Sequence, residues 1–461
     1  MKRTAPVKKG SVLTLPVTDL GIHGEGIGRI DGFTVFVPGG LPGEQVSAEI
    51  TQVKPSYAIG TLREILQTSR ERVTPLCPAF GRCGGCQISH LSYEGQLAAK
   101  HKRVRDVIRR IGGIDRDVVR PVIPAASPYG YRNKMAAPAA KKDGKSCLGF
   151  YRQGSHELIP LSCCPIQNKE NNALLARVSD FLRTHELPIY DEASGKGSLR
   201  HVVARTGKDG MLMVVLVTAA ESLPCEQEWI AALRSLPFVK SIYHNVQKRK
   251  GNVILGDKIR LLWGEKTIIA SLMGLTFDIS PYSFFQVHGA QAEILYETAL
   301  AFADLSGGET VIDAYCGTGT ISLCLARQAK KVIGLDIVKP AIDDAWKNAK
   351  RNGMKNVAFY AGDAGKLMPG LYKEGLAPEV IVMDPVRAGA GEAVLQAAAG
   401  MKPKRIVYVS CNPATFARDA KYLEQAGYRL EQVQPVDMFP QTMHIETVSL
   451  LVREKRNKNP A

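Results

Sequence analysis

Five apolar runs of strand length alternate with helical patterns between residues 276 and 453, and this alternation constrains the fold more than any other feature. The runs are TVIDAYC, KVIGLDI, VAFYAG, EVIVMDP and RIVYVSC, and helical segments such as PAIDDAWKNAKRNG and ATFARDAKYLEQAG separate them. This alternation is typical of an α/β fold with a doubly wound, Rossmann-like parallel sheet. The last pieces, YRLEQVQPVDMF and ETVSLLVREK, have no helix between them and predict an antiparallel pair that closes the sheet.

Two further regions precede this one, because a chain of 461 residues is too long for one hydrophobic core. Residues 1–66 contain short strands rich in Val, Ile, Thr and Phe between Gly and Pro, which predicts a small OB-like β-barrel of about five strands. Such barrels often bind RNA, although this pattern also fits a structural barrel. Residues 67–275 are mixed, with a cysteine cluster and a basic helix, and residues 276–461 form the third predicted domain.

The charge balance favours a polyanionic partner. The formal net charge is +16, and a basic excess of this size is typical of proteins that bind nucleic acid. No apolar run approaches the roughly 18 residues that a membrane helix needs, and no apolar segment follows the basic N-terminus as in a secretory signal. We therefore expect a cytoplasmic monomer with no membrane contact and no protein partner.

A glycine-containing loop, DAYCGTGTISL, follows a predicted strand and opens a helix. Gly317 and Gly319 allow a tight turn and a close backbone approach to a ligand. Asp336 ends the next strand, where an acid can accept hydrogen bonds from two ribose hydroxyls. Ser322 stands where a dinucleotide fingerprint has its third glycine, so the cationic S-adenosyl-L-methionine fits better than NAD. Asp363 either reaches an adenine amine or caps a helix.

Three cysteines crowd into CPAFGRCGGCQ, and a later LSCCPIQ supplies a fourth. The first three are Cys77, Cys83 and Cys86, and the fourth is Cys163 or Cys164. Both zinc and a [4Fe-4S] cluster take four thiolates, and the spacing does not separate them. The Cys-Pro pair and the wide gap before the fourth cysteine slightly favour the cluster.

Reactive side chains follow three of the predicted strands. Asp384 and Arg387 lie in MDPVR, Cys411 in SCNP, and His444 and Glu446 in MHIETV. Ligands of an open α/β sheet bind beyond the carboxyl ends of its strands, so we expect these residues to converge on one crevice.

A thiol, a carboxylate and a polar group together suit methylation of a uracil. The C5 carbon of uracil is a poor nucleophile, and a thiolate that adds to C6 converts the ring into an enolate that can attack a methyl donor. A base must then remove the C5 proton. Cys411, Glu446 and Asp384 can fill these roles, while Pro413 would stop the strand and orient the thiol. A buried strand-end thiol without chemistry is the alternative.

Taken together, these motifs resemble those of RNA uracil-5-methyltransferases, specifically the 23S ribosomal RNA type, over nearly the whole chain. HGEGIGRIDGFTVFVPGGLPGEQV is similar to the RNA-binding TRAM barrel of that family. The cysteine motifs resemble the [4Fe-4S] site of the family, which implies Cys77, Cys83, Cys86 and Cys164 as ligands.

The same resemblance implies roles in the catalytic region. SCNP implies Cys411 as the nucleophile, and HIETV implies Glu446 as the base. Three positions depart from the family pattern, since Val386 replaces a proline, Asp336 replaces a frequent glutamate, and His288, which is assigned no role, replaces a common asparagine. The residues implied to contact S-adenosyl-L-methionine are Gln286, in SPYSFFQVH, Tyr315, Asp336 and Asp384.

The expected activity is transfer of a methyl group to C5 of a uridine in 23S ribosomal RNA through a covalent cysteine–C6 intermediate. A transfer-RNA uracil-5-methyltransferase and a non-catalytic iron–sulfur RNA-binding protein are the alternatives. A target uridine in folded RNA must first be flipped out. The basic helix is expected to hold the RNA backbone through Lys100, Lys102, Arg103, Arg105 and Arg109.

Overall fold

The structure, a computed structural model, describes residues 5–454, and the chain forms two units. The first contains the residues up to Lys100 with Phe150–Ile159 and Phe439–Met443, and the second contains His101–Gly149, Pro160–Met438 and the residues from His444 onward. None of the helices within residues 5–454 has the length and apolar character needed to cross a bilayer.

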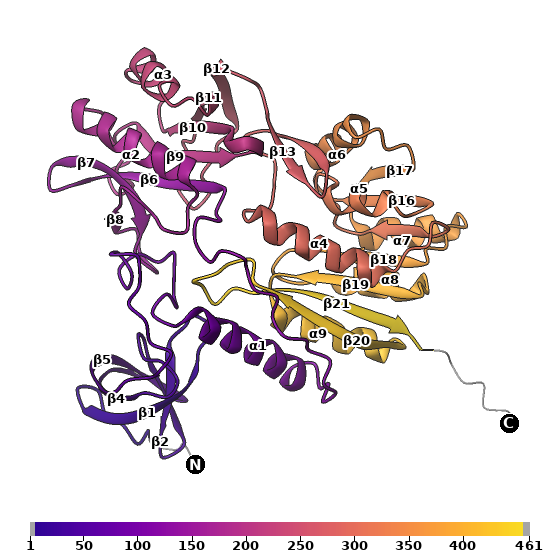
Figure 1. The fold of residues 1–461 in the computed structure, drawn as a ribbon, viewed down its shortest axis with the longest axis horizontal. Coiled ribbons are helices and arrows are strands. Elements are labelled where there is room, and N and C mark those ends of the chain that lie inside the picture. Colours follow the sequence, from indigo (N-terminus) through magenta and orange to yellow (C-terminus); the bar gives the residue numbers. More distant parts are fainter. Residues whose placement is uncertain (1–4, 455–461) are drawn as a thin grey trace. The chain divides into compact units, whose positions relative to one another are not determined.

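The predicted N-terminal barrel is confirmed. Its five strands close in the order β1-β2-β3-β5-β4 (Figure 1), and only the β3–β5 pair is parallel. Alternate side chains fill the barrel, so Leu15, Val17 and Val46 are at most 2% exposed. The strands are β1 (Val12–Leu20), β2 (Gly26–Ile30), β3 (Phe33–Val37), β4 (Gln45–Val53) and β5 (Tyr57–Gln67).

A seven-stranded sheet follows the helix α1 (Tyr93–Arg110), with its strands in the order β12-β11-β10-β9-β6-β7-β8. Helices α2 (Lys169–Thr184) and α3 (Glu226–Arg234) pack against it and against each other. The strands are β6 (Lys134–Lys142), β7 (Lys145–Tyr151), β8 (Leu158–Pro160), β9 (Leu199–Thr206), β10 (Leu212–Thr218), β11 (Val239–Val246) and β12 (Lys258–Gly264). A short 3-10 helix, η1 (Lys208–Gly210), joins β9 to β10, and a hairpin of β13 (Ile268–Leu272) and β14 (Leu275–Ile279) comes next.

The second seven-stranded sheet has the predicted doubly wound topology. Its order is β17-β16-β15-β18-β19-β21-β20, in which the first five strands are parallel. The predicted antiparallel pair, β20 and β21, closes the sheet beside β19. The strands are β15 (Thr310–Asp313), β16 (Lys331–Asp336), β17 (Val357–Ala361), β18 (Val380–Met383), β19 (Arg405–Ser410), β20 (Tyr428–Val436) and β21 (Glu446–Arg453).

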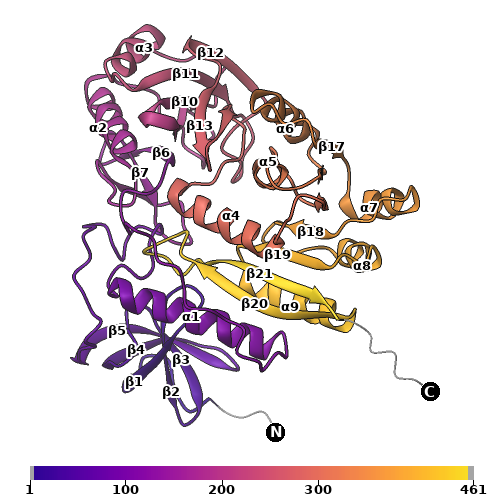
Figure 2. The same cartoon turned by 45° about the vertical axis from the view of Figure 1, so that its right-hand side comes forward.

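Helices cover both faces of this second sheet. Figures 1 and 2 show α4 with α5 on one face, whereas α7, α8 and α9 pack against one another on the other. The strand order reverses between β15 and β18, and such a reversal opens a crevice at the carboxyl ends of the strands. The helices are α4 (Gly289–Ala303), α5 (Thr320–Ala326), α6 (Lys339–Arg351), α7 (Ala364–Lys373), α8 (Glu392–Gly400) and α9 (Pro413–Gln425).

Candidate active site

The loop between β15 and α5 depends on two glycines. Gly317 and Gly319 have φ values of +53° and +83°, in the left-handed region that favours glycine. At Gly319, a Cβ atom would also lie 3.2 Å from the side chains of Ala345 and Phe359. The loop can therefore pass close to the sheet, as the sequence predicted.

Asp336, at the end of β16, stabilises this loop through hydrogen bonds. Its Oδ2 accepts a hydrogen bond from the Gly317 amide at 2.9 Å, and its Oδ1 accepts one from the Val338 amide at 2.8 Å. A carboxylate oxygen can accept more than one hydrogen bond. Asp336, although shorter than a glutamate, can thus still accept hydrogen bonds from two ribose hydroxyls. This contact stays a prediction.

Asp313, the last residue of β15, carries a buried and partly unpaired carboxyl group. Ser322 Oγ donates a hydrogen bond to its Oδ2 at 2.6 Å, whereas its buried Oδ1 has no hydrogen-bond partner among residues 5–454. Burial raises the pKa of Asp313 to about 6, although the Ser322 hydrogen bond opposes the shift. A buried carboxylate oxygen without a donor suits a cationic ligand.

Asp384 follows β18 and adds a second carboxyl group. Burial and the charge of Asp313 raise the pKa of Asp384 to about 7. Its side chain is nevertheless partly accessible to solvent, so it lies at the surface of a crevice. Among residues 5–454, none donates a hydrogen bond to it. Two neighbouring acids beside the glycine loop fit S-adenosyl-L-methionine, whose sulfonium and ammonium groups are cationic.

The other residues predicted to contact the cofactor are partly accessible. Gln286 precedes α4, and its carbonyl oxygen accepts a hydrogen bond from Asn133 Nδ2 at 3.0 Å. Tyr315 lies in the glycine loop, and burial raises its pKa. Asp363 is the N-cap of α7, where its side chain accepts a hydrogen bond from the Lys366 amide. Asp363 therefore caps a helix, which was one of its two predicted roles. This role does not exclude a contact with adenine.

Cys411 sits between the end of β19 and the start of α9. Asn412 caps this helix by accepting a hydrogen bond from the Ala414 amide, and Pro413 is its first residue. Proline is well suited to a first helical position, because its missing N–H would have no partner there. The strand therefore stops at the thiol, as predicted for Pro413.

Glu446 lies opposite Cys411. Ser410 pairs with Thr447 in the antiparallel β19–β21 ladder, so the next positions, Cys411 and Glu446, face each other across the strands. Burial raises the pKa of Glu446 well above its usual value, and the charge of Asp384 adds to the shift. Burial therefore favours the protonated form of Glu446.

The same neighbouring residues affect the pKa of the Cys411 thiol. Burial raises the pKa of Cys411 to about 11, with further contributions from Glu446 and Asp384, whereas the charge of Arg387 lowers it. The structure thus brings together Cys411, Glu446, Asp384 and Arg387, which are four of the five side chains that the sequence placed at three strand ends. Their predicted roles in catalysis remain predictions.

One set of contacts that the sequence did not reveal holds the loop after Asp384. Asp419 of α9 is 1% exposed, and its Oδ2 accepts hydrogen bonds from the Ala390 amide at 2.8 Å and the Tyr408 hydroxyl at 2.6 Å. Asn412 Nδ2 donates to the Arg387 carbonyl at 3.3 Å. The sequence signal that could have indicated these contacts is an aspartate on the apolar face of an amphipathic helix. The Gly389 amide donates to the Val386 carbonyl, so the valine at this position is compatible with a closed turn.

The predicted cysteine ligands are distributed over both units. In the first unit, Cys77, Cys83 and Cys86 are half-buried, and the Gly85 amide donates a hydrogen bond to Cys83 Sγ at 3.4 Å. Burial and the nearby Cys77 raise the pKa of Cys83. In the second unit Cys164 is buried, and its amide donates to Asn172 Oδ1 at 2.8 Å. Across residues 5–454, no three Cys, His, Asp or Glu side chains are arranged to hold a metal ion.

One residue of the basic helix was predicted wrongly. Lys100 is fully buried, and its Nζ donates a hydrogen bond to the Phe439 carbonyl at 3.1 Å, so it is inaccessible to an RNA backbone. Helical periodicity places this lysine on the apolar face of α1, where its charge is retained by a carbonyl partner. Arg103 is half-buried, and the charge of Arg387 lowers its pKa in addition to burial.

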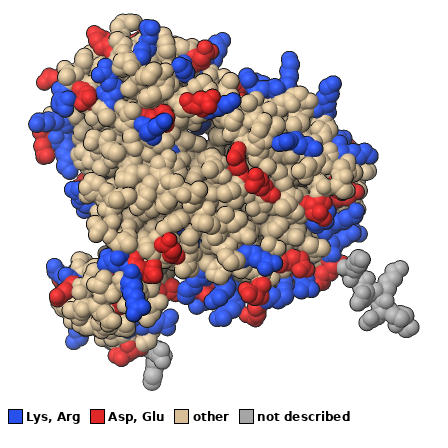
Figure 3. Space-filling view, in the orientation of Figure 1, with Lys and Arg blue, Asp and Glu red and all other residues tan. Residues whose placement is uncertain are grey.

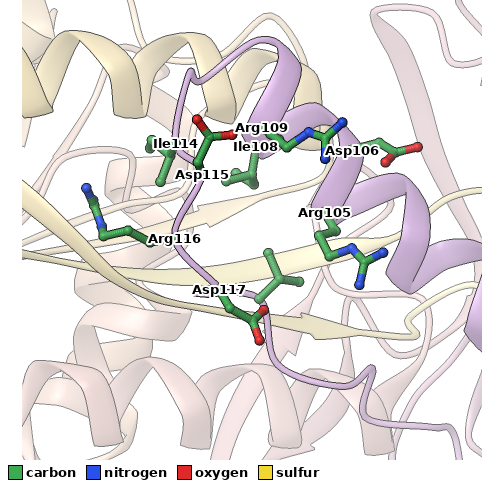
Figure 4. A pocket seen from close by; sticks show the side chains of 9 residues that line it. Arg105, Asp106, Ile108, Arg109, Ile114, Asp115, Arg116 and Asp117 are labelled. Carbon is green, nitrogen blue, oxygen red and sulfur yellow. The ribbon is translucent and has the colours of Figure 1, made fainter.

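The remaining basic residues lie towards the C-terminal end of α1, where Figure 3 shows Lys and Arg side chains gathered on this face of the molecule. Arg105 and Arg109 line a cavity of about 250 Å³ between this helix and the segment that follows it (Figure 4). Lys102 pairs with Asp106 at 2.8 Å. The cavity contains none of the predicted catalytic residues, so methyl transfer is not expected there.

Comparison with known proteins identifies the family. Residues 273–454 match the model described as tRNA (Uracil-5-)-methyltransferase, and residues 6–62 match the TRAM domain. An uncharacterized RNA methyltransferase of Halalkalibacterium halodurans is 48% identical over 98% of this chain and 99% of its own length. This chain belongs to the RNA (uracil-5-)-methyltransferase family. It is an S-adenosyl-L-methionine-dependent enzyme, and its substrate is RNA.

Two further relatives of this RNA methyltransferase span essentially the whole chain. An uncharacterized RNA methyltransferase of Bacillus cereus is 45% identical over 99% of both chains. The crystal structure of the Pyrococcus abyssi tRNA (uracil-54, C5)-methyltransferase in complex with S-adenosyl-L-homocysteine matches with a TM-score of 0.77 and 28% identity. It covers 95% of this chain and 100% of its own.

The acids of the RNA methyltransferase predict a pH-dependent cofactor affinity. Because the pKa of Asp384 is about 7, the carboxylate that attracts the sulfonium forms as pH rises through neutrality. Titration calorimetry with S-adenosyl-L-methionine should show affinity rising between about pH 6 and about pH 8. Asp384→Asn should weaken binding about tenfold at the upper pH and flatten this dependence.

Asp363→Asn is the matched control, because it also removes a carboxyl group from the end of a strand–helix connection. This variant should keep the pH dependence of the unchanged protein. An equal pH dependence in Asp384→Asn and in the unchanged protein would contradict the assignment.

Proposed function

We propose that this enzyme methylates C5 of a uridine in 23S ribosomal RNA through a covalent bond between Cys411 and C6 of the base. The observation that carries the proposal is the convergence of Cys411, Glu446 and Asp384 from three neighbouring strand ends. A metabolite methyltransferase acting on an already nucleophilic atom has no need of such a thiol. We further propose that residues 1–66 bind RNA, that residues 67–275 carry the iron–sulfur cluster and also bind RNA, and that residues 276–461 transfer the methyl group. The enzyme is proposed to act in the cytoplasm.

Each catalytic residue has a defined step. Cys411 Sγ, as the thiolate, forms a bond to C6, and the C5–C6 double-bond electrons move to the uracil oxygen as an enolate. When bound, S-adenosyl-L-methionine supplies the methyl group as an electrophile for C5. The Glu446 carboxylate then takes the C5 proton, the C5–C6 double bond re-forms, and the sulfur leaves as a thiolate.

The positive charge of Arg387 supports both steps. It lowers the pKa of Cys411 and of Glu446, opposing the effect of burial. It therefore favours the thiolate and the carboxylate that the reaction uses. Gln286, Tyr315, Asp336 and Asp384 are proposed to hold the cofactor, with Asp313 Oδ1 as a further buried acceptor.

We propose that the barrel and the exposed arginines of α1 hold the RNA backbone while the target uridine is flipped out. Arg105 and Arg109 are exposed and make no ion pair within residues 5–454. Arg103 lies close enough to Arg387 for their charges to interact. A phosphate near these two arginines would relieve their mutual repulsion.

A [4Fe-4S] cluster on Cys77, Cys83, Cys86 and Cys164 is proposed as a structural cofactor. Four thiols suit iron and sulfide, and an amide that donates to a sulfur atom, like that of Gly85 to Cys83, is a common feature around such clusters. Methyl transfer moves no electrons between substrate and enzyme, which favours a structural role. Zinc is the competing occupant.

Transfer RNA is the second candidate substrate. The Pyrococcus abyssi neighbour named for tRNA spans 95% of this chain, so domain content alone does not favour ribosomal RNA. A non-catalytic RNA-binding protein is disfavoured, because both the nucleophile and the base are present.

Trapping tests the chemistry. RNA that contains 5-fluorouridine should form a stable covalent adduct with this enzyme, because the base cannot remove the fluorine atom from C5 as it removes the C5 proton of uridine. Cys411→Ala should form none, and Cys225→Ala, which removes another half-buried thiol, should form as much as the unchanged enzyme. Glu446→Gln should accumulate an adduct on ordinary RNA, visible as a shifted band in a denaturing gel. An adduct that survives Cys411→Ala would overturn the covalent mechanism.

Mapping tests the substrate. We expect a 5-methyluridine in 23S ribosomal RNA that disappears when the gene is deleted and returns with the unchanged protein but not with Cys411→Ala. Mass spectrometry of nuclease fragments of both 23S ribosomal RNA and transfer RNA measures this. Loss of the modification from transfer RNA alone would replace the proposed substrate by the second candidate.

Metal analysis tests the cluster. Protein purified without oxygen should contain about four iron atoms and about four sulfide ions per chain. Cys83→Ser should lose most of both, whereas Cys147→Ser should retain them, because Cys147 lies in β7 and its Sγ donates to the carbonyl of Ala140 in β6. Stoichiometric zinc in place of iron would refute the [4Fe-4S] assignment.

A further inference from the structure

A buried arginine, whose Nε has no hydrogen-bond partner among residues 5–454, lies on β9 in the second unit. This residue, Arg205, is 6% exposed. Its guanidinium forms no ion pair with any residue between 5 and 454, and burial lowers the pKa of Arg205 to about 10. An uncompensated buried charge is costly, so such groups usually persist where a ligand completes them.

Two more cations surround this arginine. Lys134 of β6 is the direct cross-strand partner of Arg205, and like charges in this position repel each other. Arg132 lies two positions before Lys134, just outside β6, and its Nε donates to the Lys134 carbonyl at 3.1 Å. Burial, followed by the charges of Arg205 and Arg132, lowers the pKa of Lys134 to about 8. Neither Lys134 nor Arg132 forms an ion pair within the described part of the chain.

The cluster adjoins the candidate active site through the backbone. The Asn133 amide donates to the Val287 carbonyl at 2.9 Å, and Asn133 Nδ2 donates to the Gln286 carbonyl at 3.0 Å. The neighbouring Thr206 side chain contacts Asn171 of α2, so Arg205, one residue away, faces the opposite side of the sheet. Lys134 and Arg205, which pair across the strands, therefore lie on the side of the sheet away from α2, and Arg132 precedes Asn133, which binds the segment that carries Gln286.

We propose that Arg132, Lys134 and Arg205 form a binding site for a backbone phosphate of the substrate RNA close to the target uridine. The site deepens the proposed function and rests on it for the identity of the polyanion. A phosphodiester supplies one negative charge and two free oxygens, which match the planar fork of an arginine. Its charge would offset the repulsion between Lys134 and Arg205. The carboxylate of the cofactor is the competing anion.

Arg205→Met and Lys134→Met test the site, because each removes one charge and keeps an apolar side chain of similar length. Filter binding of in vitro transcribed 23S ribosomal RNA, without cofactor, is measured over a range of KCl concentrations. Each variant should bind about tenfold more weakly at low salt, and the slope of log affinity against log salt should fall by about one. Thermal unfolding of Arg205→Met should occur at the same or a higher temperature, since an unpaired buried charge is removed.

Arg200→Met is the matched control on the same strand. Arg200 is similarly buried and its Nε also has no hydrogen-bond partner within residues 5–454, but its Nη1 donates to the carbonyls of Gln247 and Arg249, and its guanidinium stacks on Tyr190. This variant should unfold at a lower temperature and keep the salt slope of the unchanged protein.

Unchanged RNA affinity and salt slope in both Arg205→Met and Lys134→Met would overturn the proposal. A selective loss of S-adenosyl-L-homocysteine binding in these variants would assign the cluster to the cofactor carboxylate instead. Lys134→Met carries the test if Arg205→Met does not fold, because Lys134 is only half-buried. The binding measurement involves no turnover, so it is independent of the adduct and mapping experiments. Negative results in those two experiments would contradict the proposed function and not the proposed phosphate site. Transcribed transfer RNA, measured in the same way, separates a wrong RNA from a wrong site.

Discussion

Loss of solvation around three carboxyl groups, those of Asp313, Asp384 and Glu446, is the constraint on which the catalytic region depends. Burial raises the pKa of each group, and the charge of Asp313 adds to the shift of Asp384 as that of Asp384 does for Glu446, so the ligand-free site favours protonated carboxyl groups. The same environment keeps Cys411 protonated. Any cation that enters shifts all four groups towards their ionised forms. A cationic methyl donor would therefore activate the nucleophile and the base by binding, and Arg387 already acts in this direction.

Such a site needs a rigid frame, because a charged group that could turn away from its neighbours would do so. The frame comes from the sheet and from α9. Cys411 and Glu446 are fixed by the β19–β21 register, and Asn412 and Pro413 start α9 directly after the thiol. Asp419 holds the loop after Asp384 through Ala390 and Tyr408. Replacing Asp419 would leave the buried Tyr408 hydroxyl without its acceptor, which costs about 1 to 3 kcal/mol, whereas the Ala390 amide would keep the Tyr408 oxygen as a partner.

Basic side chains in this protein differ by their partners rather than by their charge. Lys100 and Arg205 are both buried, yet Lys100 donates to a backbone carbonyl, whereas Arg205 Nε has no acceptor within the described part of the chain. The first is a structural lysine, and the second has the properties of an incomplete anion site. A net charge of +16 predicted a polyanionic partner, but it could not separate these two cases, since burial and hydrogen bonding depend on residues distant in the sequence.

The sequence by itself determined the barrel, the doubly wound sheet and its antiparallel closure, because hydrophobic periodicity and glycine or proline punctuation act locally. It also determined which residues follow the strand ends, since the carboxyl edge of a parallel sheet is shared by all its strands. Lys100 was misread because a helix pattern gives the face of a residue only approximately. Tertiary structure alone decided the elevated pKa values, the Asp419 network and the isolation of Arg205. These properties arise from groups hundreds of residues apart or on adjoining strands, and no local pattern records which partners a buried charge will meet.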